Sequence, residues 1–461
     1  MFTDELRRVP TRARLARIWP PLAVAAIALI LVALQVTAHK AGFQGPLHSL
    51  LSDYVAAPKS VTVPWVGFGL AMAGLSNRWR IAALSVAVAL DVAFAAERLV
   101  RGGGLAFGNG PLIVITGLAA VAVYRWVKGE SIPAFRGVGF GLLLIIATKV
   151  GDSWLSITAI TRPKVVDEYA LLADHALAQP SWLFGRLVEA GGPVLYGALH
   201  WVYIELPAAA LVVAFYQLRN VRTEGWPRHF LVPTFLVLGL VGPLIYLLFP
   251  LVGPAFAFGA GGGGFQIGDY WPHTLPPIDM APAAVPFDSK TPRNCMPSMH
   301  TAWALAVFIH SRPGPRWLRA GGSFWLACTI AATLGFGYHY GVDLVAGAVL
   351  CLTAEAVLRE PVRGRIWTRV GFVAFGAAFL TVLVLCCRYL AEEMARHPFV
   401  FGPLIIGATV AFVSTFYATF FARPAQAAAP EDATTLPVRG GLTAAMLAGE
   451  PAAQPEPGST R

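Results

Sequence analysis

Two short polar segments interrupt a very apolar part of the sequence: Met296-Pro297-Ser298-Met299-His300 and Gly337-Tyr338-His339-Tyr340-Gly341-Val342-Asp343. Between them lies apolar sequence with one arginine-rich break at residues 311–319. Two apolar runs joined by such a break can form a hairpin across a bilayer. That hairpin would bring both histidines to the same membrane face, together with a serine and a carboxylate. The pattern therefore predicts one polar site in an otherwise apolar helical bundle.

The composition is that of a polytopic membrane protein. Of the 461 residues, 56% are hydrophobic and 13% are charged, whereas a soluble protein carries roughly 25% charged residues. Many apolar runs have the length of about 20 residues that a membrane-spanning helix needs. We therefore predict an all-α polytopic membrane protein with about twelve transmembrane helices. The predicted spans lie near residues 19–37, 63–77, 81–99, 111–127, 137–150, 193–217, 230–253, 299–310, 322–338, 341–358, 368–387 and 400–422.

The distribution of basic residues predicts the orientation. The net charge of +10 does not indicate a nucleic-acid partner, because the arginines lie in short loops between apolar runs, as they do in cytoplasmic loops. With the N-terminus inside, the inside loops at residues 77–80, 125–136, 219–228, 311–319 and 359–369 are all basic. We predict a multi-pass protein of the inner (plasma) membrane, with the polar site on the periplasmic or extracellular side.

The chain is expected to have four parts. Residues 1–150 form an N-terminal block of five spans, and residues 151–360 contain both polar segments. Residues 361–422 add two more spans. The tail at residues 423–461 is rich in Ala, Pro, Gly and Thr, a composition that predicts disorder in the cytoplasm. No obligate protein partner is inferred.

The polar segments contain groups that can do chemistry. His339 and Asp343 are four residues apart, so they share a face on a helix. A carboxylate beside an imidazole fixes its tautomer, which makes the other ring nitrogen a better nucleophile or base. A second histidine, His300, could protonate a leaving oxygen, and Ser298 could donate a hydrogen bond. A structural role at the membrane interface is the alternative for either histidine taken singly, but two matching segments on one face favour function.

Two basic side chains lie just upstream of Ser298 and His300. Lys290 and Arg293 could hold an anion such as phosphate. No metal or other cofactor is predicted, because neither segment has a carboxylate-rich or clustered histidine ligand set and the five cysteines lack metal-binding spacing. Other charged residues are expected at the interface. Lys149, Asp152 and Arg162, at or beyond the end of the fifth span, are expected to be anchors. Asp167-Glu168 and Arg186 are expected to be solvated or to lie on an amphipathic interfacial segment.

These motifs resemble the type-2 phosphatidic acid phosphatase superfamily. Pro297-Ser298-Met299-His300 resembles its second signature, P-S-x-H, and His339 with Asp343 resembles its third. The strings at residues 294–304 and 339–343, with Tyr246-Leu247-Leu248-Phe249-Pro250, are similar to the inositol phosphotransferase branch, which includes the inositol phosphorylceramide synthases. The resemblance covers residues 165–360 and implies a six-helix phosphatase-type core there.

The resemblance also implies a role for each motif residue. His339 would attack phosphorus and form a phosphohistidine, and Asp343 would orient it. His300 would act as the acid for the leaving group and then as the base for the acceptor. Ser298 would contact a phosphate oxygen.

Two departures from the superfamily pattern concern cations. Thr333 stands where the phosphatases have an arginine six residues before the nucleophilic histidine, a loss that also occurs in the inositol phosphotransferase branch. The first signature, Lys-x6-Arg-Pro, is not present in that form. Lys290 and Arg293 are therefore the candidate replacements.

The predicted function is lipid phosphotransfer within the membrane, through a phosphohistidine at the outer face. The enzyme would move a phosphate or phospho-headgroup between lipid substrates, with a phospholipid or polyprenyl phosphate as substrate. One alternative is a lipid phosphate or polyprenyl pyrophosphate phosphatase, in which water is the acceptor. Another is a non-enzymatic lipid carrier or permease, although no inverted repeat is visible.

Overall fold

The computed structural model describes residues 11–130, 133–362 and 366–421, with side chains from residue 24 onwards except at residue 133. Over these residues the chain is mostly helical, and the longest non-helical stretch lies between α12 and α14. One antiparallel pair joins β1 (Lys164–Val165) to β2 (Val285–Pro286). The prediction of a mostly helical membrane protein is confirmed, and the predicted tail at residues 423–461 lies outside the described residues.

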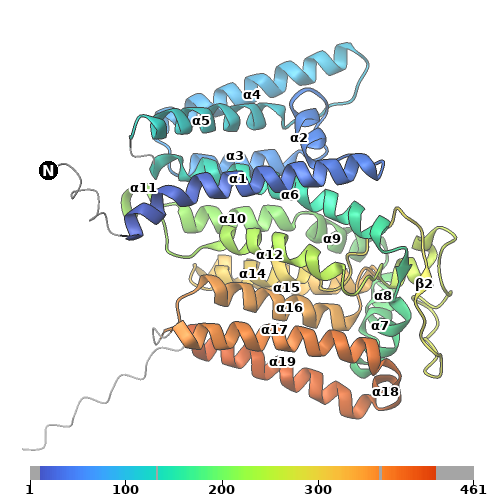
Figure 1. Cartoon of the computed structure of the whole chain (residues 1–461). Coiled ribbons are helices and arrows are strands. Elements are labelled where there is room, and N and C mark those ends of the chain that lie inside the picture. Colours follow the sequence, from blue (N-terminus) through green and yellow to red (C-terminus); the bar gives the residue numbers. More distant parts are fainter. Residues whose placement is uncertain (1–10, 131–132, 363–365, 422–461) are drawn as a thin grey trace, which may run out of the picture. The chain divides into compact units, whose positions relative to one another are not determined.

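The N-terminal part of the fold, coloured blue to teal in Figure 1, is built around α3 and α6. These two helices pack together, α4 packs against α5, and α6 also packs against α12. The bounds are α1 (Thr11–Lys40), α2 (Pro46–Val55), α3 (Thr62–Met72), α4 (Asn77–Val100), α5 (Asn109–Val127), η2 (Pro133–Phe135) and α6 (Arg136–Thr161). α6 thus continues beyond residue 150. It carries Lys149 into the interior, where its ammonium group pairs with Asp53, so the prediction of an interfacial anchor at Lys149 is wrong.

The remaining helices surround α14. Their bounds are α7 (Asp167–Asp174), η3 (His175–Leu177), α8 (Pro180–Ala190), α9 (Gly192–Ile204), α10 (Leu206–Leu218), α11 (Val221–Glu224), α12 (Leu231–Tyr246), α13 (Pro254–Ala257), η4 (Ala260–Gly262), α14 (Met299–Ser311), α15 (Arg316–Gly335), α16 (Gly341–Leu358), α17 (Ile366–Tyr389), α18 (Ala391–Arg396) and α19 (Pro398–Phe420). α14 packs against α10, α12, α15 and α16. It is the element from which the polar site is built.

Small residues let α14 and α16 approach closely. Ala302, Ala304 and Ala306 of α14 are fully buried. Gly347 of α16 lies against the backbone of Ser298, where an added Cβ would collide with the Ser298 carbonyl oxygen. Close-packed interiors do not absorb such an overlap without moving the backbone. The glycine therefore holds the beginning of α14 against α16.

Fewer helices than predicted can cross a membrane. Among the described residues, six helices are long and apolar enough, namely α4, α5, α6, α16, α17 and α19. A seventh span results if α9 and α10, which are bent by 50° at Glu205, count as one. The prediction of about twelve transmembrane helices is therefore not supported.

Short apolar helices account for the difference. α3, α12 and α14 have 11, 16 and 13 residues. At 1.5 Å per residue even α12 is only about 24 Å long, less than the ~30 Å hydrocarbon core of a bilayer. α15 has 20 residues but begins with Arg316 and includes Arg319. An apolar run has the same composition whether lipid or neighbouring helices cover it, so composition alone predicts a span at each of these runs.

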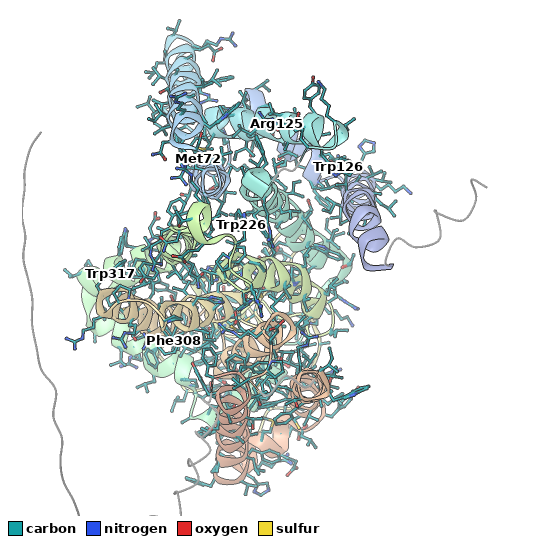
Figure 2. The ribbon with its side chains drawn as sticks, turned by 90° about the vertical axis from the view of Figure 1, so that its left-hand side faces the viewer. Met72, Arg125, Trp126, Trp226, Phe308 and Trp317 are labelled. Carbon is teal, nitrogen blue, oxygen red and sulfur yellow. The ribbon has the colours of Figure 1, made fainter. Side chains whose placement is uncertain are left out.

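Several helix ends that adjoin basic loops lie on the same side of the molecule. Figure 2 looks onto that side and labels Arg125, Trp126, Phe308 and Trp317. Trp126 and Trp317 are exposed, and tryptophan is enriched where helices meet the membrane surface. Phe308 lies near the end of α14, so the beginning of α14, with the polar site, points away from this side.

Candidate active site

The two polar segments meet at the beginnings of two helices. Ser298 is the N-cap of α14, and its Oγ accepts a hydrogen bond from the Thr301 backbone N–H at 3.4 Å. Tyr340 is the N-cap of α16, and its backbone N–H donates to Asp343 Oδ2 at 2.7 Å. The two caps are tied together because the Ser298 N–H donates to the Asp343 carbonyl oxygen at 3.0 Å. Each helix N-terminus carries about half a positive charge, so the site is suited to an anion.

His339 lies beside Asp343, as its spacing in the sequence predicts. The distance from His339 Nδ1 to Asp343 Oδ2 is 3.7 Å, longer than a hydrogen bond. Asp343 Oδ2 is already engaged by the Tyr340 N–H and by the Cys295 thiol at 2.8 Å. His339 Nδ1 and Asp343 Oδ1 are both buried without a hydrogen-bond partner among the described residues.

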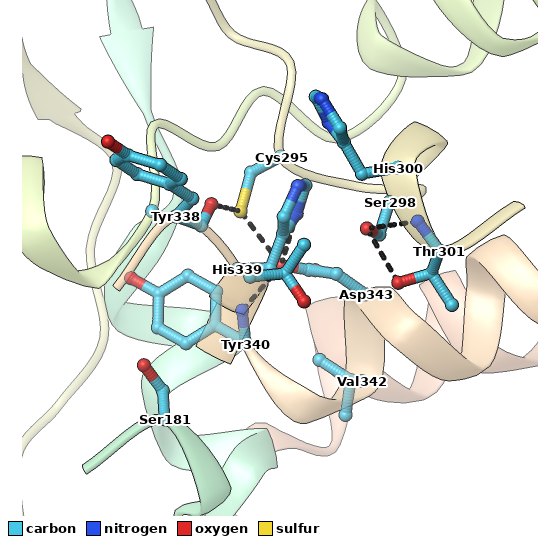
Figure 3. A network of polar contacts seen from close by, with 12 residues as sticks. Ser181, Cys295, Ser298, His300, Thr301, Tyr338, His339, Tyr340, Val342 and Asp343 are labelled. Atoms are coloured by element: carbon cyan, nitrogen blue, oxygen red, sulfur yellow. Dashed lines mark hydrogen bonds and ion pairs between the residues drawn. The ribbon is translucent and has the colours of Figure 1, made fainter. Parts of the chain in front are cut away.

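His300 is held by an aromatic residue of α9. The Tyr203 hydroxyl lies 3.0 Å from His300 Nδ1, and the two rings stack with their centroids 3.9 Å apart. Trp303 meets the same imidazole edge-on at 5.8 Å. Figure 3 shows His300 on the opposite side of Ser298 from Thr301, with His339 and Asp343 nearby. The ring orientation of His300 is thus fixed by neighbours that the motif alone does not indicate.

Two buried carboxylates support the segment that contains His339. Asp167 accepts hydrogen bonds from the Tyr340 hydroxyl and the Gly253 N–H, each at 2.9 Å, and Asp174 accepts from the Val342 N–H at 3.0 Å. Burial raises the pKa of Asp167 to about 6 and that of Asp174 to about 7. The prediction that Asp167 is solvated is wrong. Its carboxylate is buried and accepts hydrogen bonds from the backbone and from the Tyr340 hydroxyl. Only its position at the start of a short helix in an apolar region could have indicated this.

The predicted phosphate-binding cations lie elsewhere. Arg293 is fully buried, and its guanidinium donates to the carbonyl oxygens of Arg162 at 3.1 Å, Asp288 at 2.5 Å and Thr291. Lys290 is exposed on the same loop. Neither residue lines the cavity described below. Arg293 therefore serves in this structure to hold the loop.

The residue that replaces the third-signature arginine adds no charge. Thr333 is fully buried in α15. Its hydroxyl donates to the Thr329 and Ile330 carbonyl oxygens, at 2.9 Å in each case. Positive potential at the site must therefore come from the helix N-termini or from a side chain that moves.

A cavity of about 630 Å³ contains both histidines in its wall. Asn294, Tyr203 and Tyr338 lie in the same wall, and most of the other lining residues are apolar. Volumes of about 300–1,000 Å³ are usual for small-molecule sites. The two imidazoles thus lie at the polar part of a large apolar cavity. Such a cavity suits a substrate that has a polar head and a hydrocarbon chain.

Two groups of side chains among the described residues have the geometry of metal ligands. One is Cys295, His339 and Asp343; the other is His229, His310 and Glu355. In each group the candidate ligand atoms lie within 4.8 Å of one another. Arg359 lies beside the second group, with its Nε 2.5 Å from Glu355 Oε2. In this position its guanidinium would compete with a metal cation for the Glu355 carboxylate. The absence of a metal stays a prediction.

Comparison with known protein families agrees with the motifs. Residues 175–357 match the model of the PAP2 superfamily, and residues 17–157 match a domain of unknown function (DUF5933). No curated protein and no solved structure matches the chain. Residues 175–357 are thus a PAP2 superfamily domain, which includes His300, His339 and Asp343. The protein is a membrane enzyme of the phosphatase or phosphotransferase class, for which the superfamily implies lipid phosphate substrates.

Proposed function

We propose that the protein is a lipid phosphotransferase that works through a phosphohistidine on His339, at the outer face of the inner (plasma) membrane. Asp343 holds the ring proton on Nδ1, which leaves the lone pair of Nε2 free to attack. Nε2 bonds to the phosphorus of a lipid phosphate or phospho-headgroup while the bond to the leaving oxygen breaks. His300 gives its proton to that oxygen.

The second half of the reaction releases His339. His300 is now a neutral imidazole. The nitrogen that gave the proton takes a proton from the hydroxyl of the acceptor lipid. The acceptor oxygen bonds to phosphorus, and the bond between phosphorus and Nε2 breaks. Tyr203 holds His300 in both halves. As the acid, His300 is an imidazolium: its Nδ1–H donates to the Tyr203 hydroxyl oxygen, and the proton on Nε2 is the one transferred, which leaves a neutral imidazole.

One observation carries this proposal: His300 and His339 lie in the wall of the same cavity, with Asp343 behind His339. The N-termini of α14 and α16 add a preorganised positive potential of the kind that stabilises a transferring phosphoryl group. Thr333 in place of the phosphatase arginine favours the transferase over the hydrolase, because the resembling inositol phosphotransferases share that loss.

The acceptor is tested directly with purified protein in lipid. The protein is incubated with labelled phospholipids and polyprenyl phosphates, with and without inositol or ceramide, and both free phosphate and new phosphorylated lipids are measured. A new lipid that depends on the acceptor supports the transferase. Free phosphate alone would make the protein a lipid phosphatase, the second candidate. Turnover of none of these substrates would contradict both.

A carrier without enzymatic activity is the third possibility, and the PAP2 domain argues against it. The His339→Ala variant separates the two readings. An enzyme loses turnover in this variant, whereas a carrier keeps lipid transport in reconstituted vesicles.

A further inference from the structure

Part of the cavity wall lies outside the PAP2 domain. α6 supplies Leu144, Ala147, Thr148, Gly151, Asp152 and Leu155 to the wall that contains His300 and His339. These positions recur every three or four residues, so they form one face of the helix. α3 adds Val66 and Leu70. Both helices belong to the region of residues 17–157 whose family has no known function.

The opposite wall comes from the PAP2 domain. α12, which packs against α6, lines the cavity from Leu231 to Tyr246. These two residues are fifteen positions apart, so at 1.5 Å per residue the wall is about 22 Å long. Tyr246 lies toward the end of α12 that leads to the site, and Leu231 lies at the far end. The cavity thus extends from the histidines along an apolar path long enough for an extended hydrocarbon chain.

We propose that the DUF5933 region is the chain-binding part of the active site. α6 and α3 hold the hydrocarbon chain of a lipid phosphate against α12 while its phosphate lies at His339, and this wall sets how long a chain is accepted. The proposal rests on the function proposed above. The occupant is the substrate because the apolar path is continuous with the cavity wall that contains both histidines.

Two glycines allow the path to be blocked from either side. Gly151 on α6 and Gly239 on α12 both line the cavity, and an added Cβ at either position would meet no atom within 4 Å. The Cβ of a phenylalanine at either position therefore displaces no neighbouring atom, and its ring would occupy space on the cavity side. Gly139 provides a matched control, because it lies on α6, is exposed, has the same open space and does not line the cavity.

The test compares Gly151→Phe, Gly239→Phe and Gly139→Phe with the wild type on dioctanoyl and dipalmitoyl phosphatidic acid and on a polyprenyl phosphate. For both cavity variants we expect kcat/KM on the long-chain substrates to fall about tenfold or more, since losing the burial of two methylene groups already has that effect. The dioctanoyl lipid, whose chains are shorter, should lose much less kcat/KM than the long-chain substrates in both cavity variants. Gly139→Phe should resemble the wild type on every substrate. The two long-chain arms distinguish a diacyl from a polyprenyl chain.

A second readout does not depend on turnover. A long-chain lipid phosphate with a photoreactive group near the chain end should label the peptides of α3 and α6 in the wild type and in Gly139→Phe, and much less in Gly151→Phe. Labelling outside α3, α6 and α12, or equal effects of all three substitutions, would overturn the chain-binding proposal. Correct labelling by a protein that turns over no lipid would leave chain binding standing and contradict the proposed reaction instead.

Discussion

Asp343 has two tasks at the scale of a single residue. Its Oδ2 accepts from the Tyr340 N–H and the Cys295 thiol, which fixes the first turn of α16. Its other oxygen has no hydrogen-bond partner among the described residues and is available to His339. The carboxylate can therefore orient the imidazole without giving up its structural hydrogen bonds.

Replacing Asp343 by Asn should separate these tasks. The amide oxygen can still accept from Tyr340, so the protein should stay folded, but the negative charge beside His339 is lost. We expect kcat to fall about 10²–10⁴-fold, the range for a misdirected acid or base. Initial rates and thermal unfolding of the purified variant provide the measurement. Wild-type kcat in Asp343→Asn would remove Asp343 from the mechanism.

The two histidines should respond differently to the leaving group. His339→Ala should abolish turnover of every substrate, because no phosphohistidine can form. His300→Ala should also abolish turnover of lipid phosphates. With nitrophenyl phosphate as substrate, the leaving group is nitrophenolate, which departs without a proton donor, so a burst of nitrophenol should survive in this variant. Equal loss on both substrates in His300→Ala would contradict its role as the acid.

Arg293 is expected to act through the loop rather than through the substrate. Its guanidinium donates to three backbone carbonyls, and each hydrogen bond to a charged group contributes about 1.5–3 kcal/mol. Arg293→Ala should therefore lower Tm and reduce turnover together, whereas Lys290→Ala, at an exposed position, should leave Tm unchanged. An Arg293→Ala protein with wild-type Tm and a raised KM would instead restore Arg293 as a phosphate-binding residue.

At the scale of elements, the far ends of α14 and α16 are joined by one buried carboxylate. Glu355 accepts from Thr234 Oγ1 at 2.6 Å and lies 2.8 Å from His310 Nε2 and 2.9 Å from His229 Nε2. Arg359 donates to it as well. Glu355 is twelve residues from Asp343 on α16, or about 18 Å at 1.5 Å per residue, so this network stabilises the helices without touching the site.

Removing the Glu355 charge should destabilise the protein without changing its chemistry. Breaking a buried ion pair typically costs about 3–5 kcal/mol, so Glu355→Gln should lower Tm markedly while kcat of the folded fraction stays near the wild-type value. Thermal unfolding in detergent and rates normalised to folded protein test this. An unchanged Tm would show that the network carries little stability.

The two buried carboxylates of the short helix α7 should make the stability of the protein depend on pH. Asp167 and Asp174 have folded-state pKa values of about 6 and 7, above the unfolded value of 3.8. The folded protein therefore binds more protons than the unfolded chain between about pH 4 and pH 7, and the free energy of unfolding contributed by these groups falls as the pH rises through that window. Tm should be higher at pH 5 than at pH 8, and Asp174→Asn should reduce the difference. A Tm that rises over this range and is unaffected by Asp174→Asn would contradict the assignment.

At the scale of the whole molecule, the side of the membrane that the site faces decides which lipids can reach it. Ser289 and Trp317 lie at exposed positions, on loops that the basic-residue pattern predicts on opposite sides. In intact cells, a membrane-impermeant maleimide should label a Ser289→Cys protein. It should label Trp317→Cys only after permeabilisation. The reverse pattern would move the site to the cytoplasmic face.

The local sequence predicts that His300, His339 and Asp343 form the core of the site, because the signatures are short strings and helical periodicity places residues i and i+4 on one face whatever surrounds them. The structure brings the two histidines into one cavity wall, with Asp343 beside His339. The membrane class followed from composition for the same reason, since the bilayer acts on every residue of a helix alike. None of these inferences needs a contact between distant parts of the chain.

The tertiary structure decided what depends on such contacts. Hydropathy could not show that the apolar runs of α12 and α14 form helices too short to cross the hydrocarbon core of a bilayer, so it overcounts the spans. The burial of Asp167 and the engagement of Arg293 by carbonyls depend on segments that are far apart in the chain. The same holds for the cavity wall between α6 and α12, whose residues are separated by about eighty positions, and no local pattern encodes such a pairing.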